Sequence, residues 1–221
     1  MTGSVVDRVH AEVGVDPYAA PIPVLARALQ SIRAATGDEL MRTAVREVSG
    51  PSAAQSEKQR VSLVKILVAL LPGSLSALND LLIRRSGPDS YEVQFSIFCF
   101  LNEHPLVESD SRLRSQLLRS IDVYLRSVRS RSAQAAWMAG DLLGEHWRPE
   151  EAVPVLRSVA QEATYVAGRE GALHGLAHAL ERVPKREQWD IIGLLRQVAG
   201  RDRSAEVRSY ASHILDGLRG L

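Results

Sequence analysis

A short phrase of residues returns six times along this chain at nearly constant intervals. An apolar pair, an arginine, one free position and usually an apolar residue make up the phrase, whose arginines are Arg8, Arg46, Arg84, Arg119, Arg157 and Arg196. Successive arginines are 38, 38, 35, 38 and 39 positions apart, as the differences between these residue numbers show. A fixed period of this size is typical of a solenoid, in which stacked repeats contact only their neighbours. Solenoids usually work as binding surfaces.

A second stripe of residues follows the arginines with the same period. Its small or apolar anchors are Leu25, Leu63, Ile97, Ala136, Ala172 and Ala211. Positions four and seven residues after each anchor are mostly apolar as well, which indicates one buried face on each helix. We therefore predict an all-α chain that forms one domain over residues 1–221, with the shortest opening helix in the first pair, residues 1–36. The six predicted helix pairs are 3–13/22–36, 38–49/55–71, 74–86/88–103, 112–129/131–147, 149–163/165–182 and 186–200/203–219.

Three segments carry a family resemblance. Residues 204–215 read Ser-Ala-Glu-Val-Arg-Ser-Tyr-Ala-Ser-His-Ile-Leu, with Asp202 just before them, and resemble the second helix of a HEAT repeat. Residues 132–144, followed by 151–156, are similar to the bacterial variety of that repeat. The resemblance implies a right-handed, armadillo-like α-solenoid of about six HEAT-like pairs, whose second helices line the concave face. It implies no particular function, because one fold supports many functions.

Composition sets the outer limits of the functional prediction. The 221 residues are 45% apolar and 24% charged, and the formal net charge of +1 favours neither nucleic acid nor an anionic membrane as partner. Cys99 is the only cysteine, so we expect no intrachain disulfide and no thiolate metal cluster. The N-terminal residues lack the pattern of a secretory signal, and the most apolar run, 61–71, is too short to span a bilayer. We predict a cytoplasmic protein.

The arginine ladder has two interpretations. On the predicted helix 112–129, the side chains of Arg112, Arg119 and Arg126 lie opposite the apolar stripe and form an outer basic patch for an acidic partner. Alternatively, the ladder belongs to the scaffold, and its arginines pair with carboxylates of neighbouring repeats. Recurrence in every unit favours the second interpretation.

The predicted concave face gathers the best candidates for a binding site in its C-terminal half. These are Met138, Asp141, His174, His178 and His213. A lining of imidazole, thioether and carboxylate groups suits a polar partner with basic groups. We therefore predict a non-enzymatic scaffold that holds a protein or peptide in the groove, with no catalytic residue and no cofactor or metal. Phosphate-loop, nucleophile-elbow and zinc-protease motifs are all missing from the sequence.

Two enzymatic alternatives stay open. His174 and His178 are spaced to chelate a metal from one helix, with His213 of the next repeat as a third ligand in a metal-dependent enzyme. Separately, the spacing of Trp137 and Asp141 is similar to that of the HEAT-like alkylpurine DNA glycosylases, which implies that Arg169 contacts phosphate. Tyr210 stands where a second tryptophan is expected, and the lining is not basic, so nucleic acid is not the favoured partner.

Overall fold

The computed structural model describes residues 4–36, 38–50, 55–83, 90–104, 110–129 and 133–219. Within these ranges every regular element is a helix, which confirms the predicted all-α class. The elements in the first half are α1 (Val5–Val13), α2 (Ile22–Thr36), α3 (Glu39–Val48), α4 (Glu57–Ala69), α5 (Leu75–Ile83) and α6 (Ser90–Asn102). Those in the second half are α8 (Ser111–Ser127), α9 (Ala133–Asp141), η3 (Leu142–His146), α10 (Pro149–Glu162), α11 (Val166–Ala179), η4 (Leu180–Arg182), α12 (Lys185–Arg201) and α13 (Ala205–Arg219).

The chain divides into two compact units, residues 1–113 and 114–221. The first unit is built around α4, which packs against α1, α2, α3, α5 and α6. Residues 62–71 are all buried, so the most apolar run of the sequence is the centre of a helical core. Lys65 lies inside this run, and its ammonium group donates to the carbonyl of Tyr18 at 3.1 Å. In the described part of the chain, no helix combines the length and apolar character that crossing a membrane requires.

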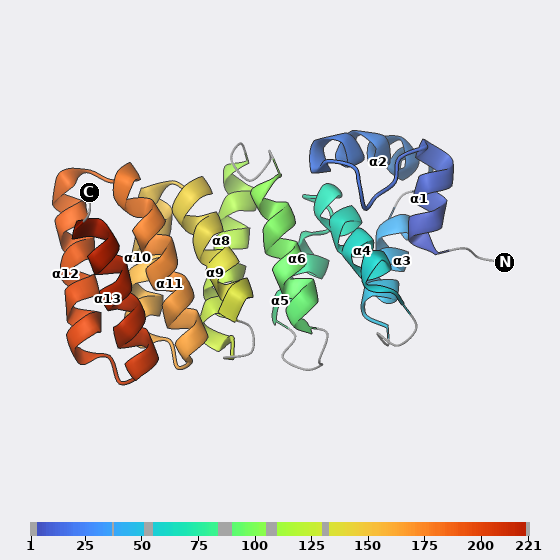
Figure 1. Ribbon diagram of the computed structural model, residues 1–221. Helices are drawn as coiled ribbons and strands as arrows, with labels where there is room; N and C mark the ends of the chain where they lie inside the picture. Colours follow the sequence, from blue (N-terminus) through green and yellow to red (C-terminus); the bar gives the residue numbers. More distant parts are fainter. Residues whose placement is uncertain are drawn as a thin grey trace. The chain divides into compact units, whose positions relative to one another are not determined.

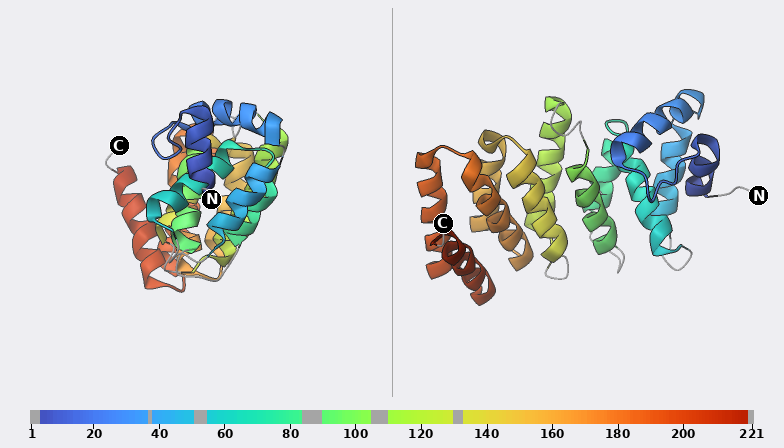
Figure 2. Two further views of the ribbon diagram at one scale, coloured as in Figure 1. Left: turned by 90° about the vertical axis from the view of Figure 1, so that its right-hand side faces the viewer. Right: turned by 45° about the horizontal axis from the view of Figure 1, so that its top comes forward.

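The second unit contains a layer of three helices, α9, α11 and α13. Helix α11 packs against both α9 and α13, so these three lie side by side, while α10 and α12 pack behind α11 and α13 (Figure 1). The turned view shows α12 and α13, in red tones, at the C-terminal end of this unit (Figure 2). Polar groups of α9, α11 and α13 that point away from α10 and α12 therefore share one surface.

Glycine residues bring α9 and α11 into close contact. Gly140 and Gly144 lie one turn apart on one side of the interface, and Gly171 and Gly175 lie one turn apart on the other. A Cβ atom at Gly140 would collide with the carbonyl oxygen of Gly171, and a Cβ at Gly171 would collide with that of Ala136. The absence of side chains at these positions allows the two backbones to approach each other directly.

We expect Gly171→Ala to destabilise the protein by about 2–4 kcal/mol, because the collision is with backbone that cannot rotate away. Gly193→Ala is the matched control, because a Cβ at this exposed helical position meets nothing within 4 Å. It should stabilise the fold by up to about 1 kcal/mol through helix propensity. Urea unfolding of both variants measures the difference, and equal stabilities would contradict the packing described here.

Candidate functional site

Side chains from three helices meet on the surface of the α9–α11–α13 layer. Two imidazoles converge on one carboxylate oxygen: His174 Nε2 lies 2.8 Å and His178 Nε2 lies 3.1 Å from Asp141 Oδ1. The side chains of Asp141, His174 and His178 are 21%, 27% and 37% exposed, so the group is accessible from solvent. We call Trp137, Asp141, His174, His178 and Tyr210 together the Asp141 cluster.

The aromatic half of the cluster connects the three helices α9, α11 and α13. The indole of Trp137 on α9 stacks on the ring of Tyr210 on α13, with centroids 5.6 Å apart and planes inclined by 8°. It also stacks on His174 of α11, with centroids 5.8 Å apart. The Tyr210 hydroxyl lies 2.6 Å from His174 Nδ1 and forms a hydrogen bond with it. Trp137 on α9 is therefore held by ring contacts with both α11 and α13.

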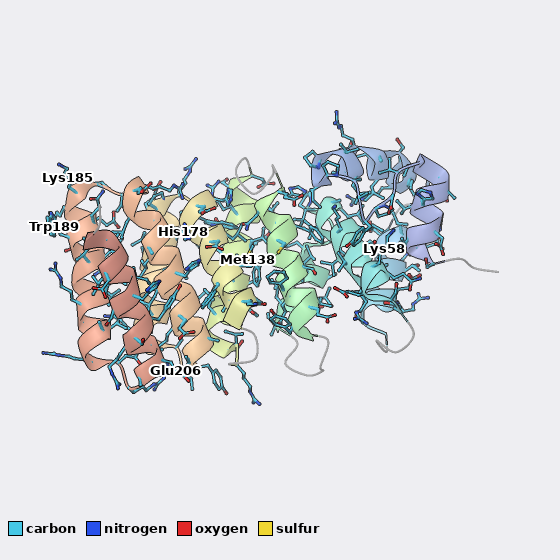
Figure 3. All side chains as sticks on the ribbon, viewed as in Figure 1. Lys58, Met138, His178, Lys185, Trp189 and Glu206 are labelled. Carbon is cyan, nitrogen blue, oxygen red and sulfur yellow. The ribbon has the colours of Figure 1, made fainter. Side chains whose placement is uncertain are left out.

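Further carboxylates surround the cluster. Glu145 Oε1 lies 3.0 Å from His178 Nδ1. Burial raises the pKa of Glu170, and the negative charge of Glu206 raises it further. Burial also raises the pKa of the Tyr210 phenol to about 12, with smaller contributions from Glu170 and Asp141. We call Glu145, Glu170 and Glu206 the acidic rim. Figure 3 labels Glu206 on α13, His178 on α11 and Met138 on α9.

The local backbone explains why these side chains meet. Trp137 and Asp141 each precede an α9–η3 glycine by three positions, while His174 and His178 each follow an α11 glycine by three positions. Residues three apart share a helix face, so both pairs lie beside the close glycine contact. Asp141 is also the last residue of α9, directly before the π-helix η3. Interruptions of this kind are frequent at functional sites.

The structure brings together some of the predicted site residues and separates others. Asp141, His174 and His178 form the core of the cluster. Met138 is half-buried on α9 and His213 is exposed on α13. Neither joins the ion-pair and ring contacts that the described residues make in the cluster. The predicted third metal ligand, His213, is replaced by Asp141.

Arg169 lies in a structural position rather than at the surface. Its side chain is 2% exposed, and its guanidinium donates to both carboxylate oxygens of Asp202 at 3.0 and 3.1 Å. It also donates to the carbonyls of Ala163 and Thr164. The role of phosphate-contacting residue, implied by the glycosylase resemblance, therefore does not fit Arg169. The stacked contact between Trp137 and Tyr210 leaves no open slot between them for a base.

The outer basic patch is partly neutralised by neighbouring acids. Arg126 lies 2.8 Å from Asp122 and 3.3 Å from Glu162 of α10. Arg112 and Arg119 are exposed. Nearby, Arg114 is almost fully buried in an ion pair with Glu151 at 2.7 Å, and the Arg114 guanidinium lowers the pKa of that carboxyl. Arg114 and Arg126 of α8 therefore each contact an acid of α10.

Two other surface features bring together fewer reactive or charged side chains than the Asp141 cluster does. Trp189, the fifth residue of α12, is 66% exposed (Figure 3). A hollow of about 370 Å³ in the first unit lies between α1 and the start of α4. Its charged residues are already engaged, because Lys58 pairs with Asp16 at 3.4 Å and Asp7 caps α1.

Comparison of the chain with known protein families, with curated proteins and with solved structures finds no match to any of them. The residues of the site therefore have to be interpreted from their own geometry and chemistry.

We expect Arg169→Leu to destabilise the protein by about 3–5 kcal/mol, because it leaves the largely buried Asp202 carboxylate without its partner. Arg119→Leu, at an exposed position of α8, should change stability by less than about 0.5 kcal/mol. The double variant Arg169→Leu/Asp202→Leu should lose less stability than the two single substitutions lose when their effects are added. Additive losses in denaturant unfolding would show that the pair is not coupled.

The raised pKa of Tyr210 predicts a specific titration. The neutral phenol is favoured in the folded protein, so its contribution to stability is complete below pH 10 and is lost as the pH rises towards about 12. NMR of tyrosine labelled at Cζ, with Tyr210→Phe to assign the resonance, should show this ring ionising near pH 12. Ionisation at pH 10, the ordinary value, would contradict the buried environment.

Proposed function

We propose that this protein is a non-enzymatic scaffold that holds a basic segment of a protein partner on the α9–α11–α13 surface. The proposal includes the HEAT-like arrangement of about six helix pairs that the sequence resembles, and a cytoplasmic location. Stacked repeats supply an extended row of second helices, and the Asp141 cluster is the centre of the contact.

One observation carries the proposal: the surface concentrates carboxylates that no arginine or lysine neutralises among the described residues. Asp141 and Glu145 contact only imidazoles in ion-pair range. Glu170 and Glu206 repel each other, and Arg169, whose positive charge acts on Glu170, is already bound to Asp202. An arginine or lysine of a partner would relieve this repulsion.

The aromatic residues add the second component of a protein contact. Trp137 and Tyr210 are half-buried and stacked on each other, so part of each ring faces solvent while its conformation is already restricted. Tryptophan and tyrosine are enriched among the residues that dominate binding energy, and their rings attract cationic side chains. A flexible basic peptide would therefore find both charge complementarity and rigid apolar area.

Selection from a random peptide display library tests the proposal. Peptides selected by the wild type should be rich in arginine and lysine, and their affinity should fall as salt concentration rises. The double substitution Glu170→Gln/Glu206→Gln should weaken binding of the selected peptides by about tenfold. This change in affinity corresponds to about 1.4 kcal/mol for two charge contacts.

The matched control is Glu150→Gln/Asp190→Asn, which removes the same charge from exposed positions of α10 and α12. It should leave peptide affinity unchanged. Equal losses in both double variants, or selected peptides without basic residues, would contradict the proposed surface. Release of a base from alkylated DNA that requires Asp141 would replace the scaffold with the glycosylase alternative.

A further inference from the structure

We propose that Asp141, His174 and His178 bind one divalent transition-metal ion. The inference does not depend on the scaffold function, because it needs only these three side chains. One nitrogen of each imidazole and one carboxylate oxygen lie within 4.8 Å of one another. The two nitrogen–oxygen distances are 2.8 and 3.1 Å. Adjacent donor atoms around an ion with bonds of about 2.0–2.2 Å lie roughly 2.8–3.6 Å apart, from octahedral to tetrahedral geometry.

The second nitrogen of each ring supports this interpretation. His178 Nδ1 faces Glu145, 3.0 Å away, and an ionised carboxylate only accepts hydrogen bonds. With its proton on Nδ1, donated to Glu145, His178 directs the lone pair of Nε2 towards Asp141. His174 Nδ1 is likewise bound by the Tyr210 hydroxyl. Metal-bound histidines in proteins characteristically have such a partner on the other ring nitrogen.

Asp141 Oδ1 is a suitable ligand atom for a cation. It is buried from solvent, and no aligned hydrogen bond to it is formed by the described residues although both Nε2 atoms are close. A carboxylate oxygen facing imidazole lone pairs is repelled unless a cation lies between them. A bound metal ion supplies that cation without requiring the imidazoles to be protonated.

The donor set indicates the class of metal. Two imidazole nitrogens and one carboxylate suit Zn²⁺, Co²⁺, Ni²⁺ or Fe²⁺, whereas Mg²⁺ and Ca²⁺ prefer oxygen donors throughout. Three protein ligands leave at least one coordination position for water or for a group of a bound molecule. The partial exposure of His174 and His178 allows the ion to enter directly from solvent.

Titration of the tag-free full chain with Zn²⁺ by calorimetry, and with Co²⁺ by visible absorption, tests the site. We expect one ion per chain and a Co²⁺ spectrum of low coordination number. His174→Ala/His178→Ala and Asp141→Asn should each weaken binding by more than about 100-fold, since each removes a ligand. Glu145→Gln and Tyr210→Phe should weaken it by about 10- to 100-fold, the range found for groups that orient metal ligands.

His213→Ala is the matched control, because it removes an exposed imidazole from the same layer without touching the three ligands. Glu170→Gln/Glu206→Gln should also retain the metal while losing basic peptides, which separates failure of this inference from failure of the scaffold. Circular dichroism confirms that each variant is folded. Absence of Zn²⁺ and Co²⁺ binding to the folded wild type, or equal affinity in the double histidine variant, would overturn the proposal.

Discussion

The direct backbone contact between α9 and α11 is the constraint on which the rest of the second unit depends. Four glycines, Gly140, Gly144, Gly171 and Gly175, line that contact, and at each of them a Cβ would meet backbone of the facing helix. Because the helices approach so closely, side chains three positions away on each helix face one another across a short distance. The convergence of Asp141 with two histidines is a consequence of this approach. The candidate site and the packing of the unit thus have one physical cause.

The arginines that form ion pairs in the second unit are of two kinds. Arg114 and Arg169 are nearly inaccessible to solvent, and each forms a two-pronged contact with an acid at least 33 positions away. Such pairs lock one helix pair to the next, because removing either partner leaves an uncompensated buried charge. Arg126, at 35% exposure, shares two acids in a more solvated setting, where ion pairs contribute less. The carboxylates of Asp202 and Glu151 are therefore already engaged by arginines, whereas those around the Asp141 cluster are available to ligands.

The scaffold and the metal site represent two responses to the same electrostatic situation. Carboxylates and imidazoles are gathered on one surface, where no ion pair with an arginine or lysine is formed among the described residues. The surface therefore has an affinity for positive charge. The metal ion requires donor atoms that converge on a point, which Asp141, His174 and His178 provide. A basic peptide requires charge spread along a surface, which the acidic rim provides. Both proposals use Asp141, but Glu170 and Glu206 belong to the peptide surface alone, and substitutions there separate the two experimentally.

Periodicity in the sequence determined the helical class and the approximate bounds of the helices, since apolar positions at helical spacing report burial on each helix separately. The same periodicity identified Asp141, His174 and His178 as surface candidates. Their convergence was decided only by tertiary packing, because sequence spacing places residues on a face but says nothing of how closely two helices approach. The sequence did contain a signal for this convergence, because glycines lie one turn apart on α9–η3 and again on α11. That signal can be interpreted only when the two helices are known to be neighbours. Arg169 and Trp189 show the same limit of sequence analysis. Arg169 is buried because it pairs with Asp202, more than 30 positions away, and the exposure of Trp189 likewise depends on which helices pack beside α12. No local sequence pattern encodes either.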